Sequence, residues 1–157
     1  MLTNAKTAIA ALALGVVSVA TAAPASAVLW RSQSDPLFVY EDDVRQGGAY
    51  GNFYNDGQVR AMSTSWQKDY RPGGNYVRVE TDFMFYGPTN TCGGNACWYT
   101  SASKQTVETR SDDWIKDSRA RDLAPQGEKA RGHIDICEVQ AWSNDPCSAK
   151  ALPTFDY

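Results

Sequence analysis

The chain has 157 residues, with 15 basic and 18 acidic side chains and a formal net charge of −3 at pH 7. This charge argues against binding to nucleic acid or to an anionic membrane surface, because both favour a basic face. The length corresponds to about one domain, and no part of the chain has the roughly 18 consecutive apolar residues of a membrane helix. We therefore expect neither a nucleic-acid nor a membrane partner.

The N-terminus has the layout of a cleavable secretory signal. A single lysine precedes a largely apolar run over residues 8–20, and small residues flank Ser26 at the expected cleavage site. We predict a signal peptide over residues 1–27 and a secreted, extracellular protein that begins at Val28. Removing the signal leaves 14 basic and 18 acidic side chains, a net charge of −4.

Residues 28–45 form an N-terminal segment that is apolar where most chains are polar and frayed. We expect this segment to be extended. It must either pair with the sheet of the following domain, residues 46–157, or dock onto another molecule. Its apolar side chains are Val28, Leu29, Trp30, Leu37, Phe38, Val39 and Tyr40.

The following domain shows strand and turn signals. Residues 49–54 and 58–66 flank an Asn-Asp-Gly sequence, which supplies the positive-φ residues of a tight hairpin. The sequence RPGGN, residues 71–75, predicts a second turn, because proline fixes one φ angle and glycine frees the next. Residues 76–86, YVRVETDFMFY, then alternate strictly between β-branched or aromatic and polar positions, which predicts a strand with one wet face.

The second half of the domain gives weaker signals. Residues 98–101 and 104–109 are candidate strands, and residues 110–132 are charged, with low β-propensity, typical of a long loop or a short helical turn. Residues 132–142 predict another strand, with a bulge or an end near Cys137 where the alternation breaks. Short strands separated by Gly, Pro and Asn predict an all-β fold, a small antiparallel β-sandwich or barrel.

Four cysteines lie in the predicted exported region, where thiols oxidise. Spacings of four and nine intervening residues match no common zinc site, so we expect two disulfides and no metal or cofactor. Four cysteines allow three pairings. We favour the local pairs Cys92–Cys97 and Cys137–Cys147, each of which would stabilise the fold by roughly 2 to 3 kcal/mol.

Catalytic candidates are few. His133 is the only histidine, so any nucleophile–histidine arrangement must use it, and no G-x-S-x-G sequence occurs. Glu80 and Asp82 could serve as a glycosidase pair, but they occupy the wet side of the predicted strand. We therefore predict a protein that is not an enzyme and has no catalytic residues.

Aromatic side chains are the more informative group. All five tryptophans follow the predicted signal, and several tyrosines cluster near the two hairpin turns, where burial of every ring is difficult. Exposed Tyr and Trp form protein interfaces and sugar platforms, although cross-strand packing is an equal alternative. We predict a possible aromatic surface formed by Trp66, Tyr70 and Tyr76.

The sequences AYGNFYNDG, RPGGN, CGGNACWYT and ARGHIDICEVQAWSNDPCS together resemble small secreted two-disulfide proteins of filamentous actinobacteria. The likeness extends to the adaptor component of umbrella toxin particles, which are secreted antibacterial assemblies. In that family the non-catalytic adaptor joins a lectin-bearing subunit to the repeat stalk of the toxin subunit, and its N-terminal segment enters a cleft on the lectin-bearing partner.

The resemblance implies that the apolar residues of the segment over 28–40 are partner-binding, through strand addition or groove docking. The sequence thus predicts a secreted adaptor that links protein subunits of a toxin complex. A carbohydrate-binding module is the alternative, and a small secreted enzyme or toxin centred on His133 is a third.

Overall fold

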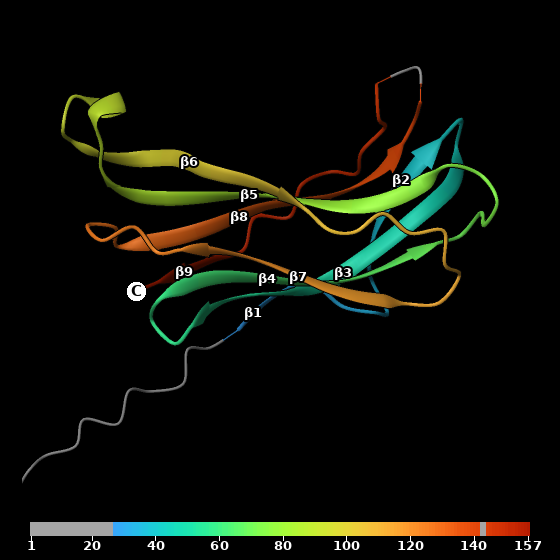
Figure 1. The fold of residues 1–157 in the computed structure, drawn as a ribbon, viewed down its shortest axis with the longest axis horizontal. Coiled ribbons are helices and arrows are strands. Elements are labelled where there is room, and N and C mark those ends of the chain that lie inside the picture. Colours follow the sequence, from blue (N-terminus) through green and yellow to red (C-terminus); the bar gives the residue numbers. More distant parts are fainter. Residues whose placement is uncertain (1–26, 142–143) are drawn as a thin grey trace, which may run out of the picture.

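The computed structural model describes residues 27–141 and 144–157, so the predicted signal peptide lies outside the described residues except for Ala27. The regular secondary structure of the described residues is almost entirely strand (Figure 1). Their bounds are β1 Val28–Arg31, β2 Leu37–Glu41, β3 Val44–Asp56, β4 Arg60–Asp69, β5 Tyr76–Pro88, β6 Ala96–Gln105, β7 Ile115–Asp122, β8 Lys129–Val139 and β9 Thr154–Asp156, with a short 3-10 helix η1 at Asn90–Cys92.

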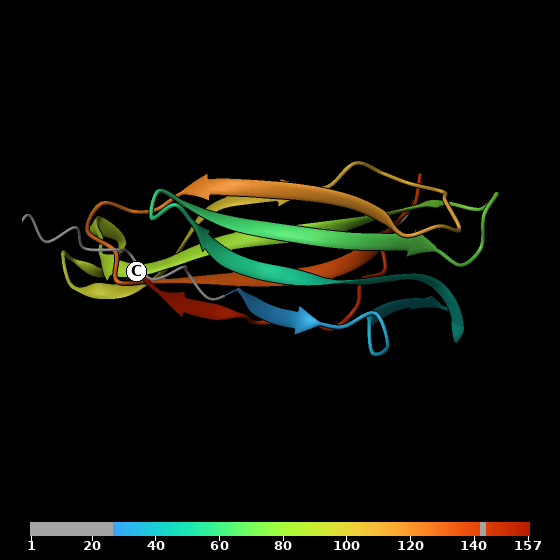
Figure 2. The ribbon, with the colours of Figure 1, turned by 90° about the horizontal axis from the view of Figure 1, so that it is seen from below.

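The strands form two antiparallel sheets that pack face to face (Figures 1 and 2). The first sheet has the order β1-β3-β4-β7, and β2 also pairs with β3. The second has the order β6-β5-β8-β9. The predicted all-β sandwich is therefore confirmed.

The core lies between the sheets and follows from the alternation of β5. The residues Val77, Val79, Thr81, Phe83 and Phe85 are all buried, whereas the intervening side chains are half-buried. The first sheet contributes Phe53 to the core, and its ring centroid lies 5.9 Å from that of Phe83 and 5.2 Å from that of Phe155 on β9. Burying these rings supplies much of the hydrophobic stabilisation.

Both predicted turns are present. Asp56 and Arg60 close the β3–β4 hairpin over a loop in which Gly57 and Gln58 have φ angles of 62° and 59°. In the turn between β4 and β5, Gly73 has a φ of 100° and the amide of Gly74 donates to the carbonyl of Arg71. These positive φ values explain why glycine stands at both turns.

One sequence expectation in the second half is wrong. The charged stretch 110–132 contains the strand β7, and its charges fit because β7 is the edge of the first sheet, where charged side chains discourage pairing with other chains. Of the two alternatives predicted near Cys137, the structure has the strand end, since β8 pairs with β5 without a register shift and ends at Val139. Residues 147–151 pair with the edge of β8 through backbone hydrogen bonds, beside the buried Cys137.

Both disulfides have the predicted local pairing, Cys92–Cys97 and Cys137–Cys147. The first closes the connection between β5 and β6 around η1. The second ties the segment before β9 to β8, with Cys137 completely buried. The oxidised pairs therefore fix two connections that have few core side chains of their own.

The N-terminal segment pairs with the chain's own sheet, which is the first of the two alternatives. Strand β1 pairs with residues 51–53 of β3, and β2 pairs with residues 44–49, so both lie along one edge of β3. Trp30 is buried against Gly51, where a Cβ atom would touch its ring and overlap the carbonyl oxygen of Thr64. The segment is thus part of the sandwich.

We expect the substitution Trp30→Ala to lower the free energy of unfolding by about 3–5 kcal/mol, because it empties a buried site in the core. The neighbouring Leu29 has 60% of its surface exposed, so Leu29→Ala should change stability by less than about 0.5 kcal/mol. Urea denaturation followed by fluorescence measures both. Equal effects of the two substitutions would show that β1 does not pack as described.

Candidate functional site

The outer faces of the two sheets differ in chemistry. Aromatic side chains gather on the outer face of the first sheet, on alternate positions of β2, β3 and β4. The outer face of the second sheet carries ion pairs, centred on Arg78 of β5 with Glu80, Glu108 and Asp145. The first face is therefore the stronger candidate for binding another protein.

Six rings on this face form a continuous series of contacts, which we call the aromatic ridge. Successive ring centroids lie 4.9 to 6.5 Å apart, within the range of favourable aromatic contacts. One pair, Tyr50 and Trp66, is stacked with an interplanar angle of 3°. In order of contact the ridge consists of Tyr40, Phe38, Tyr70, Trp114, Tyr50 and Trp66.

Glycine in β3 allows the ridge to close over the backbone. A Cβ atom at Gly48 would lie 2.9 Å from the ring of Tyr70 and 3.3 Å from that of Phe38. These two rings come from β2 and from the residue that follows β4, on either side of β3. Their contact, at 6.0 Å between centroids, therefore depends on the missing side chain.

Three cations accompany the ridge. The guanidinium of Arg45 lies 3.9 Å from the ring centroid of Phe38, and the ammonium groups of Lys68 and Lys116 lie 5.3 and 5.2 Å from Tyr70 and Trp66. None of the three forms an ion pair within the described residues. The ridge consequently combines aromatic rings with three cations, although the chain as a whole is acidic.

The seven predicted partner-binding residues lie in different environments, some in the core and some at the surface. Trp30, Leu37 and Val39 point into the core. Phe38 and Tyr40 belong to the ridge, whereas Leu29 is exposed and Val28 half-buried on β1.

The predicted aromatic surface is also divided. Trp66 and Tyr70 belong to the ridge, but Tyr76 starts β5 in the other sheet, with Arg110 stacked 3.8 Å from its ring centroid. Sequence reasoning missed Trp114 as a surface residue, because β7 was taken for a loop or helical turn.

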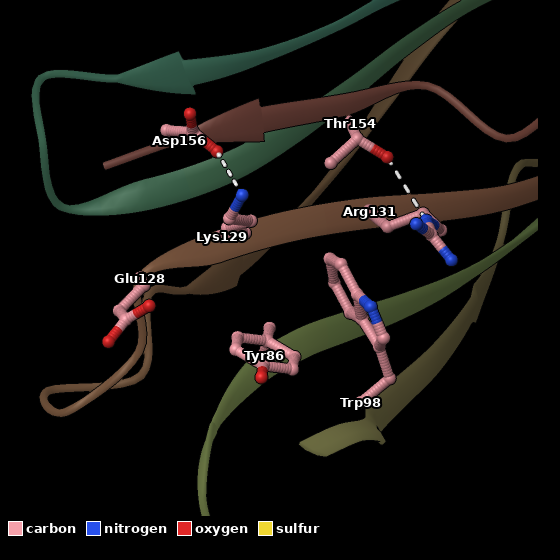
Figure 3. Close-up of a pocket in the computed structure, with 7 residues that line it drawn as sticks. All are labelled: Tyr86, Trp98, Glu128, Lys129, Arg131, Thr154 and Asp156. Carbon is pink, nitrogen blue, oxygen red and sulfur yellow. Dashed lines mark hydrogen bonds and ion pairs between the residues drawn. The ribbon is translucent and has the colours of Figure 1, made fainter. Parts of the chain in front are cut away.

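A separate pocket of about 480 Å³ lies on the outer face of the second sheet, near the end of β5 and the start of β8 (Figure 3). Tyr86 and Trp98 form one side, with ring centroids 5.5 Å apart. From β8, Arg131 stacks 4.2 Å from the Trp98 centroid and donates from Nε to Thr154 at 3.0 Å. The pocket is completed by Glu128, Lys129 and Asp156. Aromatic walls with a few fixed polar groups are typical of small-ligand sites.

His133 lies opposite Asp82 in the β5–β8 register. Burial and the nearby Lys150 and Arg131 hold the pKa of His133 below its ordinary value. Ser103 donates its hydroxyl directly to Asp82 at 2.6 Å, whereas a catalytic triad places the serine on the imidazole. Asp82 thus links Ser103 and Lys150 in one polar network beside His133.

Asp135 is the most perturbed member of the same network. Burial raises its pKa to about 6, and the negative charges of Glu80 and Asp82 act in the same direction, whereas Lys150 opposes them. The Lys150 ammonium lies 3.9 Å from Asp135 and 3.2 Å from Asp82. Asp135 also lies near the Cys137–Cys147 disulfide, whose sulfur atoms are oxidised and not available as metal ligands.

The chain matches no protein-family model, no curated protein and no solved structure with significant similarity. Within the described residues, no helix has the length and apolar character needed to cross a membrane.

The raised pKa of Asp135 predicts a pH dependence of stability. Between about pH 4 and pH 6 the folded state holds a proton that the unfolded state has lost, so the free energy of unfolding should fall as pH rises through this window. We expect Asp135→Asn to remove that fall and to stabilise the protein at pH 7 by about 3 kcal/mol.

Thermal denaturation at pH 4, 5, 6 and 7 measures this effect. The exposed Asp156 serves as the control, and Asp156→Asn should leave the profile unchanged. If Asp135→Asn instead destabilised the protein at pH 7, attraction to Lys150 would outweigh the cost of burying the carboxylate.

Proposed function

We propose that the protein is a secreted, non-catalytic adaptor that binds another protein through the aromatic ridge. The supporting observation is the ridge itself, six contacting rings on an outer sheet face with three cations that lack ion pairs within the described residues. Tyr, Trp and Arg are the residues that contribute most to binding energy at protein interfaces. The two disulfides agree with an extracellular location.

The charge of the ridge favours an acidic partner surface. Arg45, Lys68 and Lys116 are held over aromatic rings, so they can meet partner carboxylates with little loss of side-chain freedom. Complementary charge would also speed association and exclude basic competitors. A second copy of this acidic chain is a weaker candidate, because its own aromatic ridge carries the same positive charge.

The resemblance described above supports a finer proposal, that the adaptor links subunits of an extracellular antibacterial toxin complex. The subunits proposed are a lectin-bearing protein and a repeat-stalked toxin. In this proposal Phe38 and Tyr40 of the N-terminal segment contact the partner while β2 stays paired with β3. The partner would then bind a preformed sheet face, and displacement of β2 from the core would not be required.

Purification of the complex from the native culture medium, followed by binding measurements with recombinant variants, tests the proposal. Trp66→Ala combined with Tyr70→Ala should weaken partner binding at least about 30-fold, the effect of a single interface hot spot of about 2 kcal/mol. Trp98→Ala, on the other sheet, is the matched control and should bind normally. Normal binding by the double variant would rule out the ridge as the interface.

Carbohydrate binding is a second candidate function, favoured by the pocket in Figure 3. Trp98 and Tyr86 provide aromatic surface, and Arg131 and Lys129 provide donors for hydroxyl or carboxylate groups of a sugar. If this function holds, a glycan array should give hits that Trp98→Ala abolishes and Trp66→Ala retains. An array without hits for the folded protein would contradict it.

A further inference from the structure

The interior of the sandwich becomes polar near the end of β4 and the end of β8. Gln67 of β4 is completely buried there, and both polar atoms of its amide form hydrogen bonds, since Nε2 donates to the Val107 carbonyl and Oε1 accepts from Thr106 and from the Val79 amide. Two carboxylates, Asp69 and Glu138, are buried beside this region. Unlike Gln67, each of these carboxylates has one oxygen atom without a hydrogen-bond partner within the described residues.

Glu138 has one carboxylate oxygen without a partner. Glu138 has only 3% of its surface exposed, and Asn75 donates from Nδ2 to Oε1 at 3.1 Å. Within the described residues, Oε2 accepts no hydrogen bond. Because a buried carboxylate oxygen without a donor is energetically costly, its presence needs an explanation.

Glu138 lines a cavity of about 420 Å³ between the β2–β3 hairpin and the β4–β5 turn. Glu41, Asn75 and the exposed Arg71 also line this cavity. The Arg71 guanidinium forms no ion pair in the part of the chain that the structure describes. Glu138 thus places a buried carboxylate oxygen without a hydrogen-bond partner beside this cavity.

The electrostatics favour a positive ligand. Burial raises the pKa of Glu138 and the nearby carboxylates Glu41 and Asp69 act in the same direction, whereas hydrogen bonds to Asn75 and Gln140 lower it. A cation in the cavity would offset both the lost hydration and the repulsion between carboxylates. Three carboxylates do not converge closely enough here to make a metal cluster, since the close His, Cys, Asp and Glu group found in the described residues lies around Asp135.

The cavity adjoins one end of the aromatic ridge. Glu41 directly follows Tyr40, and Arg71 directly follows Tyr70. A partner that covers both the ridge and the β4–β5 turn would reach the cavity. A lysine or arginine side chain is long enough to reach inward from such a surface, and its apolar stem can pack on the flanking rings.

We propose that this cavity receives a lysine or arginine side chain of the partner that binds the aromatic ridge, with Glu138 Oε2 as its acceptor. The identity of the partner rests on the proposed adaptor function, whereas the cation site itself can be tested without the partner. The partner surface is thus acidic along the ridge and has one basic anchor at its end.

Titration of the ¹⁵N-labelled mature protein with N-acetyl-arginine amide and N-acetyl-lysine amide tests the site, because both probes carry the cationic side chain alone. We expect saturable NMR shifts of the Gly74 and Asn75 amides with at least one of them. N-acetyl-citrulline amide, the neutral analogue of the arginine probe, should bind at least about tenfold more weakly.

Glu138→Gln removes the acceptor charge at nearly constant volume and should weaken binding of the cationic probe at least tenfold. Should that variant not fold, Glu41→Gln on the same cavity should weaken binding about threefold. Glu128→Gln, in the distant pocket of Figure 3, is the matched control and should leave binding unchanged.

Three results would each overturn the proposal. The first is the absence of saturable shifts at Gly74 and Asn75, and the second is equal binding of the citrulline probe. The third is full binding by Glu138→Gln or, where that variant does not fold, by Glu41→Gln. Saturation of the same amides by Ca²⁺ with no response to the organic cations would also overturn it, in favour of a metal site. None of these results bears on the Trp66 and Tyr70 test, so the adaptor function stands or falls separately.

Discussion

The glycines of β3 are the constraint on which the packing of this sandwich depends. A Cβ atom at Gly47 would lie 2.7 Å from Val77 of the opposite sheet, so this glycine sets how closely the sheets approach. Gly51 makes room for the buried Trp30, and Gly48 allows Phe38 and Tyr70 to meet outside the sheet. Core, N-terminal strands and aromatic ridge therefore depend on the same strand, although glycine itself weakens strands.

The two outer faces satisfy their charges differently. On the second sheet Arg78 lies 2.9 to 3.2 Å from the carboxylates of Glu80, Glu108 and Asp145, and Lys150 pairs with Asp82. These two cations already have anionic partners, so an incoming molecule would have to compete with them, whereas Arg131 on the same sheet stacks on Trp98. On the first sheet the cations rest on rings, and an acidic surface would add ion pairs without breaking any.

Local signals in the sequence were enough to predict the sandwich, both turns and both disulfides, because alternation, turn residues and short cysteine spacings act over a few positions. Strand β7 was missed because edge strands tolerate the charges that local propensity assigns to loops. Phe38 and Tyr40 are expected at a surface, but a single contact series that also includes Trp66 and Tyr70 could not be predicted. That series depends on the register of β2 and β4 against β3, which no local pattern contains.

The same register explains how an apolar N-terminal segment can serve both the fold and a partner. Along β2, Leu37 and Val39 face the core, while Phe38 between them faces outward. A partner that contacts Phe38 therefore needs no exchange of β2, which would expose two core side chains. Ring contacts on both sides of Phe38 also restrict its rotamer before binding, so less side-chain entropy is lost on association. A segment fixed in this way is a rigid binding surface, in contrast to a free strand that must fold upon its partner.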